Sequence, residues 1–175
     1  AKRRKEPQRI VPEARSAIVI CDNYYYQQPN PQPVPKVAKY ALGTDYHVAT
    51  RNRINKLADW LLGRGATTAL PYIDAGPVPE RELAQRAGLG WIGKNTMLIA
   101  PQAGSYVLIG AVFTDLALVP DAPFTEDHCG TCTRCLDACP TGAFVEPRVL
   151  DATRCISYLT IEHRGDIPET LADRF

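Results

Sequence analysis

The first 119 residues alternate between short apolar runs, which predict strands, and stretches in which apolar residues recur at helical spacing. SAIVI at 16–20 and TTALPYID at 67–74 are the first two predicted strands. Between them, 47–62 predicts a helix, because its apolar and polar residues fall on opposite faces. The apolar face consists of Ile54, Leu57, Ala58 and Leu61, and the helix is ended by Gly63 and Gly65.

A second helix is predicted to begin at Pro79 and to end before Gly88, with acidic residues near its positive end. Two further apolar runs, TMLIA at 96–100 and YVLIGAVF at 106–113, flank the sequence PQAGS and predict an antiparallel pair of strands. Strands that alternate with helices and finish with such a pair predict a three-layer α/β domain with a mixed sheet.

Loop signals divide the chain into three parts. Residues 1–15 are predicted to form an exposed basic arm, 16–119 the α/β domain, and 120–175 a second domain that begins at the sequence PDAP. The proline-rich stretch QQPNPQPVP at 27–35 is incompatible with a central strand or a helix, so it is predicted to be a loop.

Charge is distributed unevenly along the chain, although the net charge of the 175 residues is only +1. Residues 1–64 carry twelve Lys and Arg against five Asp and Glu, whereas the remainder is net negative. The basic half either meets a polyanion such as RNA or is an ordinary solvated surface, and charge alone does not decide. Because we find neither a membrane-spanning apolar run nor a secretory signal, we expect a cytoplasmic protein.

Four cysteines lie close together in CGTCTRCLDACP at 129–140, with the spacing C-x2-C-x2-C-x3-C-P. Cysteines this close on one loop can supply several thiolates to a single iron–sulfur cluster, and this run is the bacterial ferredoxin pattern. Structural disulfides rarely join such near neighbours in a cytosol-like protein. Zinc sites usually use two separated C-x2-C pairs. The spacing therefore predicts iron–sulfur chemistry.

The chain has too few cysteines to supply all the ligands of two clusters. Three ligands of one cluster are predicted to be Cys129, Cys132 and Cys135. Cys139 would serve a second cluster together with Cys155, which lies on a predicted helix capped by Asp151. Either a returning cysteine segment lies beyond Phe175, so that the chain is truncated, or one cluster is built within 129–155 alone. The sixth cysteine, Cys21, is interpreted as a buried small hydrophobe.

The sequence GLGWIG at 88–93 fits the dinucleotide-binding pattern G-x-G-x-x-G. That pattern binds a pyrophosphate only after a strand and at the start of a helix. Here it follows a predicted helix and leads into a predicted strand, so nicotinamide binding is not expected. The glycines would instead let the backbone approach a large flat ligand, with Lys94 and Asn95 as its polar edge.

Several stretches together closely resemble the epoxyqueuosine reductase family. They are YALGTDYHVATRNRINKLADWL, YIDAGPVPERELAQRAGLGWIGKNTMLI, HCGTCTRCLDACPTGAF and RCISYLTIEHRG, and the likeness runs from about Val11 to about Glu169. The resemblance implies an architecture like that of reductive dehalogenases, with a cobalamin-binding α/β domain followed by a ferredoxin-like domain with two [4Fe–4S] clusters, here only partial. It implies removal of the epoxide oxygen from epoxyqueuosine at the wobble position of tRNA.

The resemblance also implies roles for individual residues. Asp74 would be the general acid, which requires its pKa to be raised by burial beside the corrin; the alternative is an aspartate in a turn at a strand end. Asp45 and His47 would line the cobalamin pocket; a helix-cap pair is the alternative. DYHVAT has Thr50 where a cobalt-ligating histidine signature needs glycine. Other cobalamin contacts would come from Asp74, Lys94, Asn95, Met97, Leu98 and Ser157.

The implied partners are the anticodon stem-loop of tRNA and an unidentified reductant, and we expect a monomer with no membrane association. Arg51, Arg53 and Lys56 are candidates for contacts with tRNA phosphates. His128 and His163 receive no role. Two other functions stay open: a ferredoxin-type electron-transfer module fused to a structural α/β domain, and a cobalamin enzyme of the reductive dehalogenase type acting on a small molecule.

Overall fold

The computed structural model describes residues 9–27, 37–74 and 78–174, which divide into two compact units. The first unit contains the described residues up to Gly90 together with Leu98–Thr125. The second unit contains Trp91–Met97 together with the described residues from Glu126 onward. The short segment Trp91–Met97 therefore belongs with the cysteine region, although it lies within the span that the sequence assigned to the α/β domain.

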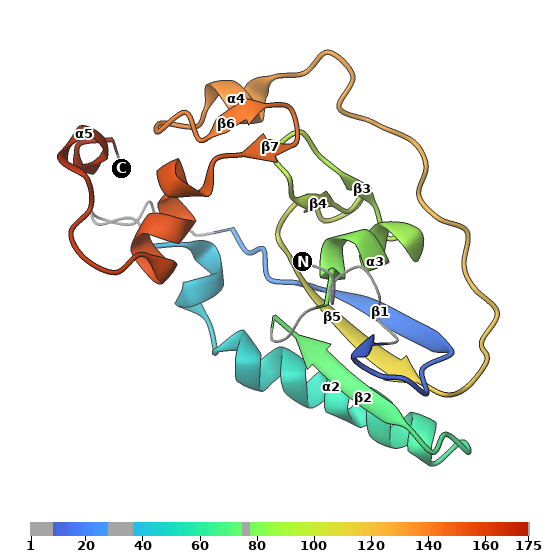
Figure 1. The fold of residues 1–175 in the computed structure, drawn as a ribbon. Helices are drawn as coiled ribbons and strands as arrows, with labels where there is room; N and C mark the ends of the chain where they lie inside the picture. The colour runs from blue at the N-terminus through green and yellow to red at the C-terminus, as the bar shows by residue number, and fades with distance from the viewer. Residues whose placement is uncertain (1–8, 28–36, 75–77, 175) are drawn as a thin grey trace. The chain divides into compact units, whose positions relative to one another are not determined.

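Three strands form the sheet of the first unit in the order β1-β5-β2 (Figure 1). They are β1 (Ser16–Asn23), β2 (Ala69–Ile73) and β5 (Val107–Thr114). β5 is central and runs antiparallel to both neighbours. The mixed sheet expected from the sequence is not seen among the described strands, because the two strands that run in the same direction are separated by β5.

Helices cover both faces of this sheet. The helix α2 (Tyr46–Leu62) lies against one face, where its Ile54, Ala58 and Leu61 form a buried cluster with β2 and β5. Leu83 of α3 (Glu80–Arg86) packs against a second cluster that includes Ala111 and Phe113 of β5. Since successive residues of β5 point to opposite faces, the three-layer α/β arrangement is confirmed for this unit.

The close approach of α2 to the sheet depends on Gly110 of β5. A Cβ atom at this position would lie 2.2 Å from Cδ1 of Ile54, whose side chain is completely buried. A larger residue would therefore force the buried Ile54 side chain to repack or the helix to move. The register pairs Gly110 with Ile73, the last residue of β2, so this contact fixes the end of the strand that precedes Asp74.

The prediction of an antiparallel pair of strands at 96–100 and 106–113 is wrong in part. The strand expected at 96–100 is reduced to β4 (Leu98–Ile99), and β5 has β1 and β2 as its neighbours instead. The chain after β4 closes in a tight turn, in which Gly104 has a φ of 62° and its carbonyl accepts a hydrogen bond from Ala100. The predicted loop at 27–35 and the arm at 1–15 lie largely outside the described residues.

The second unit consists of short elements. The strand β3 (Trp91–Ile92) precedes α4 (Arg134–Asp137) and the antiparallel pair β6 (Phe144–Glu146) and β7 (Val149–Leu150). The single helix expected around Cys155 is instead a 3₁₀ turn η3 (Ala152–Arg154) and a π-helical turn η4 (Tyr158–Glu162), followed by α5 (Glu169–Ala172). Asp151 caps η3, accepting a hydrogen bond from the Thr153 N–H at 3.0 Å.

Along the described residues, we find no helix both long and apolar enough to cross a bilayer.

Asp115 joins the end of β5 to the segment before β2 and makes stability depend on pH. Its carboxylate accepts hydrogen bonds from the Thr67 hydroxyl at 2.6 Å and from the Thr68 N–H at 3.1 Å. These bonds, that of Thr67 first, lower the pKa of Asp115 from 3.8 to about 2. Because the folded pKa is depressed, the stabilisation is complete above about pH 4 and is lost as the pH falls toward 2.

We therefore expect Asp115→Asn to lower the midpoint of thermal unfolding at pH 7, because an amide offers one acceptor oxygen where the carboxylate offers two. The difference from the wild type should shrink between pH 4 and pH 2. Circular dichroism melts across this range measure it. A deficit that stays constant with pH would show that the charge of Asp115 does not contribute.

Candidate functional site

Asp74 lies directly after β2, at the carboxyl end of the strand, and its side chain is exposed. Its backbone has a φ of 47°, in the left-handed region that aspartate tolerates better than most residues. Oδ2 of Asp74 accepts a short hydrogen bond from the hydroxyl of Tyr46, the first residue of α2. The carboxylate is therefore oriented by a side chain 28 residues away in the sequence.

The Tyr46 side chain is itself held in place by neighbouring aromatic rings. Its ring stacks on that of His47, with centroids 4.1 Å apart, and meets the edge of the Tyr40 ring at 6.1 Å. Burial first, and then the hydrogen bond to Asp74, raise the pKa of Tyr46 well above its usual value. The Tyr46 hydroxyl thus stays protonated and continues to donate to Asp74.

Asp45 and His47 form the cap of α2. The Asp45 carboxylate accepts hydrogen bonds from the His47 N–H at 2.8 Å and from the His47 ring nitrogen Nδ1 at 2.9 Å. The backbone bond is the larger reason that the pKa of Asp45 lies below its usual value. This is the helix-cap pair that the sequence left open. Tyr46, which lies between them in the sequence DYH, was not predicted to be functional.

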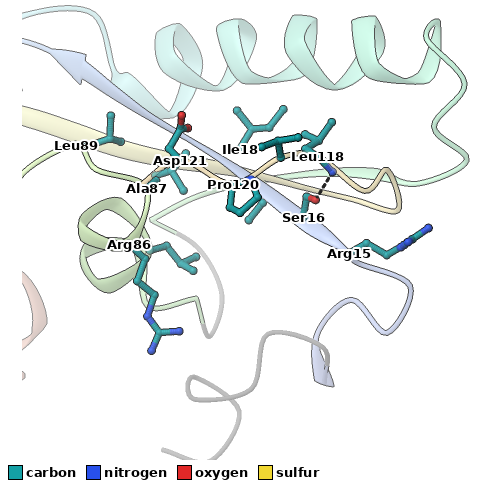
Figure 2. A pocket seen from close by; sticks show the side chains of 13 residues that line it. Arg15, Ser16, Ile18, Arg86, Ala87, Leu89, Leu118, Pro120 and Asp121 are labelled. Carbon is teal, nitrogen blue, oxygen red and sulfur yellow. Dashed lines mark hydrogen bonds between the residues drawn. The ribbon is translucent and has the colours of Figure 1, made fainter. Parts of the chain in front are cut away.

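Among the described residues, the first unit contains two cavities of note. One, of about 300 Å³, is lined by Tyr46 together with tyrosines 24, 26 and 40 and the cations Lys39 and Arg53. The other, of about 580 Å³, lies along β1 and α3 (Figure 2). There Ser16 Oγ accepts a hydrogen bond from the Leu118 N–H at 2.9 Å, and none of the residues predicted to be functional lines it.

The loop that carries the first cysteines is fixed by backbone and side-chain hydrogen bonds within the second unit. The Cys129 N–H donates to Asp127 at 2.9 Å, and the Cys132 N–H donates to the Cys129 carbonyl at 2.9 Å. Arg148 forms an ion pair with Asp127 at 2.6 Å. The backbone bond to Cys129 is the first cause that lowers the pKa of Asp127.

The segment Trp91–Met97 holds the same loop. Nζ of Lys94 donates to the carbonyls of Gly130 and Cys132 at 2.7 and 3.0 Å, and these two residues lie within and at the end of the first C-x2-C step. Nε1 of Trp91 donates to the Cys129 sulfur at 3.4 Å. The glycine-rich sequence therefore supports the cysteine loop. As expected, this sequence follows a helix. Glycine is needed at position 90 because a Cβ atom on Gly90 would lie 2.1 Å from the Ile99 carbonyl oxygen.

Cys139 lies in a polar environment of its own. Its sulfur accepts a hydrogen bond from the Ala143 N–H at 3.3 Å and lies 3.6 Å from the buried Thr141 hydroxyl. Burial alone would raise the pKa of Cys139, but the hydrogen bonds from Ala143 and Thr141 outweigh it and lower the pKa. Cys155 lies between η3 and η4 and is half-buried.

The predicted cysteine ligands do not converge on a metal ion in the part of the chain that is described, where no three His, Cys, Asp or Glu side chains are arranged to hold one. The five remain predicted ligands on the strength of their spacing. Cys21 is half-buried within β1 beside a core cluster, and burial raises its pKa.

The residues predicted to bind cobalamin are divided between the units. Asp45, His47, Asp74 and Leu98 belong to the first, and Lys94, Asn95, Met97 and Ser157 to the second. Leu98 is 1% exposed and packs with Ala84 and Val107 in a core cluster, so its side chain is not accessible to a cofactor in this structure. Met97 is 43% exposed, and the Asn95 side chain accepts a hydrogen bond from its N–H.

Comparison with known proteins gives the family. Residues 4–75 match the family model for epoxyqueuosine reductase QueG, DUF1730, and residues 128–174 match that for a 4Fe-4S double cluster binding domain. An epoxyqueuosine reductase from Gloeobacter violaceus is 44% identical over 174 residues, which are 98% of this chain and 54% of that protein. The chain belongs to the epoxyqueuosine reductase family. The Escherichia coli epoxyqueuosine reductase is 47% identical over 136 residues, 77% of this chain and 36% of that protein.

Solved epoxyqueuosine reductases have the same fold. One, crystallised with an epoxyqueuosine-modified tRNA-Tyr stem-loop, superposes with a TM-score of 0.89 at 35% identity over 96% of this chain and 46% of that one. The Bacillus subtilis epoxyqueuosine reductase, solved with an aspartate-bearing catalytic loop swung out of the active site, gives 0.85 at 35% identity over 97% and 46%. This chain spans about half the length of the relatives that it matches.

Proposed function

We propose that this chain takes part in the reductive deoxygenation of epoxyqueuosine to queuosine at the wobble position of tRNA. The observation that carries the proposal is the exposed Asp74 carboxyl, oriented by the Tyr46 hydroxyl at the carboxyl end of β2. The reaction consumes two electrons and two protons, breaks both carbon–oxygen bonds of the epoxide, forms a carbon–carbon double bond and releases the oxygen as water. Asp74 supplies the first of these protons.

The residues of the chain fit cobalamin as the cofactor only in part. When bound, cobalamin supplies a low-potential metal centre, which no side chain can provide. Asp74, Met97 and Ser157 are exposed and thus available to a ligand of that size, whereas Leu98 is buried. The cavity beside Tyr46 is at the lower limit of about 300–1,000 Å³ for small-molecule pockets, so it is too small to hold a whole corrinoid.

The cysteine region fits [4Fe–4S] clusters by the chemistry of its donors. Cys129, Cys132 and Cys135 would hold three corners of one cluster, and Cys139 and Cys155 would serve another. The N–H groups of Trp91 and Ala143 point at the sulfurs of Cys129 and Cys139, which is the kind of hydrogen bond that tunes such clusters. Clusters held by these cysteines would supply electrons one at a time.

Asp74 is the general acid in this proposal, a role that requires a bound ligand to cover its exposed carboxyl. Its carboxyl proton is transferred to the epoxide oxygen as the first carbon–oxygen bond breaks, and Tyr46 holds the other carboxyl oxygen in place. A positioned acid of this kind contributes about 10²–10⁴-fold to a rate. The reduction of epoxyqueuosine for which the relatives are named, and the tRNA stem-loop bound by one of them, support RNA as the substrate.

Of the three cations of α2 proposed to contact tRNA phosphates, one is already paired with a carboxylate. The side chains of Arg51 and Lys56 are exposed and face solvent, but Arg53 forms an ion pair with Asp22. Because a carboxylate already neutralises Arg53, its contribution to phosphate binding is smaller than that of its neighbours. Arg51 and Lys56 remain the proposed phosphate contacts on this helix.

An anaerobic absorption spectrum tests the proposal. The chain is reconstituted with iron and sulfide, incubated with cobalamin and freed of excess by gel filtration. Retained corrinoid bands would support the proposed function. Iron without corrinoid would favour the ferredoxin-type module, which the match of residues 4–75 already makes less attractive. Corrinoid binding together with turnover of a small halogenated compound, and none of an epoxyqueuosine stem-loop, would favour the dehalogenase-like alternative.

A further inference from the structure

The sequence NYYYQ after β1 is not used by the proposed chemistry, yet its tyrosines are part of an extended aromatic group. Tyr24 meets the rings of Tyr40 and Tyr106 edge-on, with centroids 6.5 and 5.7 Å apart. The Tyr25 ring lies 5.0 Å from that of Tyr106, and Tyr40 contacts Tyr46. We refer to Tyr24, Tyr25, Tyr26, Tyr40, Tyr46 and Tyr106 as the tyrosine cluster.

Most of the tyrosine cluster faces solvent. Tyr25, Tyr26 and Tyr106 are 51%, 41% and 41% exposed, and Tyr40 is 37% exposed. Side chains that served only to fill the core would be buried, as Ile54 and Leu61 of α2 are. Exposed aromatic rings gathered in one place are typical of a surface that binds a ligand.

Cations lie among these rings. Nζ of Lys39 lies 5.0 and 5.4 Å from the ring centroids of Tyr25 and Tyr26, and donates to the Tyr26 carbonyl at 3.0 Å. Arg53 lines the same cavity, paired with Asp22. Lys39 uses one of its three donors on that carbonyl, so it has donors left for an anion.

We propose that the tyrosine cluster and the 300 Å³ cavity that it borders bind an unpaired nucleotide of RNA, with the base stacked on a tyrosine ring and the phosphate held by Lys39. Aromatic rings interleaved with cations are the means by which proteins hold single-stranded nucleic acid. The net charge of this half of the chain, +7 over residues 1–64, favours a polyanion.

The position of the cavity relative to Asp74 makes the assignment specific. Tyr46 both lines the cavity and donates to the Asp74 carboxylate. A nucleotide stacked there would lie one side chain away from the proposed acid. The inference therefore rests on the proposed function, and it names the residues that select unpaired RNA. The nucleotide tail of cobalamin has the same base and phosphate chemistry, and binding measurements with RNA and with corrinoids separate the two sources.

Fluorescence anisotropy with a labelled anticodon-type stem-loop tests the inference, with a blunt duplex of equal length for comparison. We expect the variant that removes the stacking ring, either Tyr26→Leu or Tyr40→Leu, to weaken binding of the stem-loop about tenfold, the effect of one lost stacked base. Both variants should leave duplex binding unchanged. Tyr26→Phe and Tyr40→Phe should bind normally, because phenylalanine retains the stacking face. Tyr158→Leu is the matched control, since Tyr158 is 37% exposed but lies in the other unit.

The contribution of the Lys39 charge is tested by measuring how RNA binding depends on salt concentration. Lys39→Gln should reduce the slope of log K against log salt concentration by about 0.7, the value for one phosphate contact on a single strand. Wild-type affinity in both leucine variants would overturn the inference, as would equal losses for stem-loop and duplex. Weaker binding of cobalamin but not of cobinamide, with RNA binding unchanged, would assign the cavity to the cobalamin tail. Retention of corrinoid by the wild type tests the proposed function separately.

Discussion

Replacing Asp74 by asparagine is expected to slow turnover of an epoxyqueuosine stem-loop severely and to leave cobalamin binding intact. The amide has nearly the same shape and still accepts a hydrogen bond from the Tyr46 hydroxyl, but it has no proton of suitable acidity for the epoxide oxygen. A loss of about 10²–10⁴-fold in kcat is the range for a removed general acid. Single-turnover assays with pre-reduced protein isolate the step from electron supply.

Asp59→Asn is the matched control for this prediction, because Asp59 is an exposed carboxylate on the outside of α2. Tyr46→Phe provides a graded comparison: it removes only the hydroxyl that orients Asp74, so turnover should fall by less than in Asp74→Asn. If Asp74→Asn turned over at the normal rate, Asp74 would be a turn residue, as the alternative interpretation of its sequence has it.

Replacing Lys94 by methionine is expected to lower the iron affinity of the first cysteine loop by about 10–100-fold, the usual cost of losing a residue that positions metal ligands. Methionine keeps the aliphatic length of lysine but cannot donate to the carbonyls of Gly130 and Cys132. The loop then loses the two hydrogen bonds from Lys94 that hold its backbone. Iron and sulfide content per chain after reconstitution at limiting iron measures the effect.

Lys56→Met makes the same chemical change on α2 of the first unit and should load iron normally. Unfolding must be monitored in parallel, because a general loss of structure would also reduce the iron content. Full loading of Lys94→Met would mean that the cysteine loop is rigid without its side-chain support, and Lys94 would return to the set of candidate cofactor contacts.

Local patterns in the sequence were sufficient for the helices of the first unit. The spacing of Ile54, Ala58 and Leu61 predicts the bounds of α2 to within one residue. This is possible because the apolar residues of a buried helix face recur at helical spacing. The prediction was weaker for TMLIA, where Leu98 is buried by tertiary packing and only two residues pair as a strand. An apolar run does not indicate which neighbours it has.

The site was predictable where its chemistry is local and not where it is long-range. The cysteine spacing and Asp74 are visible in short sequence stretches. The support of Cys129 by Trp91, and of Asp74 by Tyr46, joins residues 38 and 28 positions apart, and no local signal marks such pairs. The glycine-rich sequence likewise suggested a ligand, because glycines required by close backbone packing and by a ligand are the same in the sequence.

The contribution of Trp91–Met97 to the second unit has a consequence for how the cysteine module can be transplanted or inherited. A piece cut at the apparent linker, from Glu126 onward, would carry every predicted cluster ligand and yet leave behind the lysine that fastens their loop, 36 residues upstream of Gly130. During synthesis that anchor emerges from the ribosome before the loop. The cysteine region from Glu126 onward therefore lacks a residue that holds its loop, and recombination at the linker would separate the predicted ligands from Lys94.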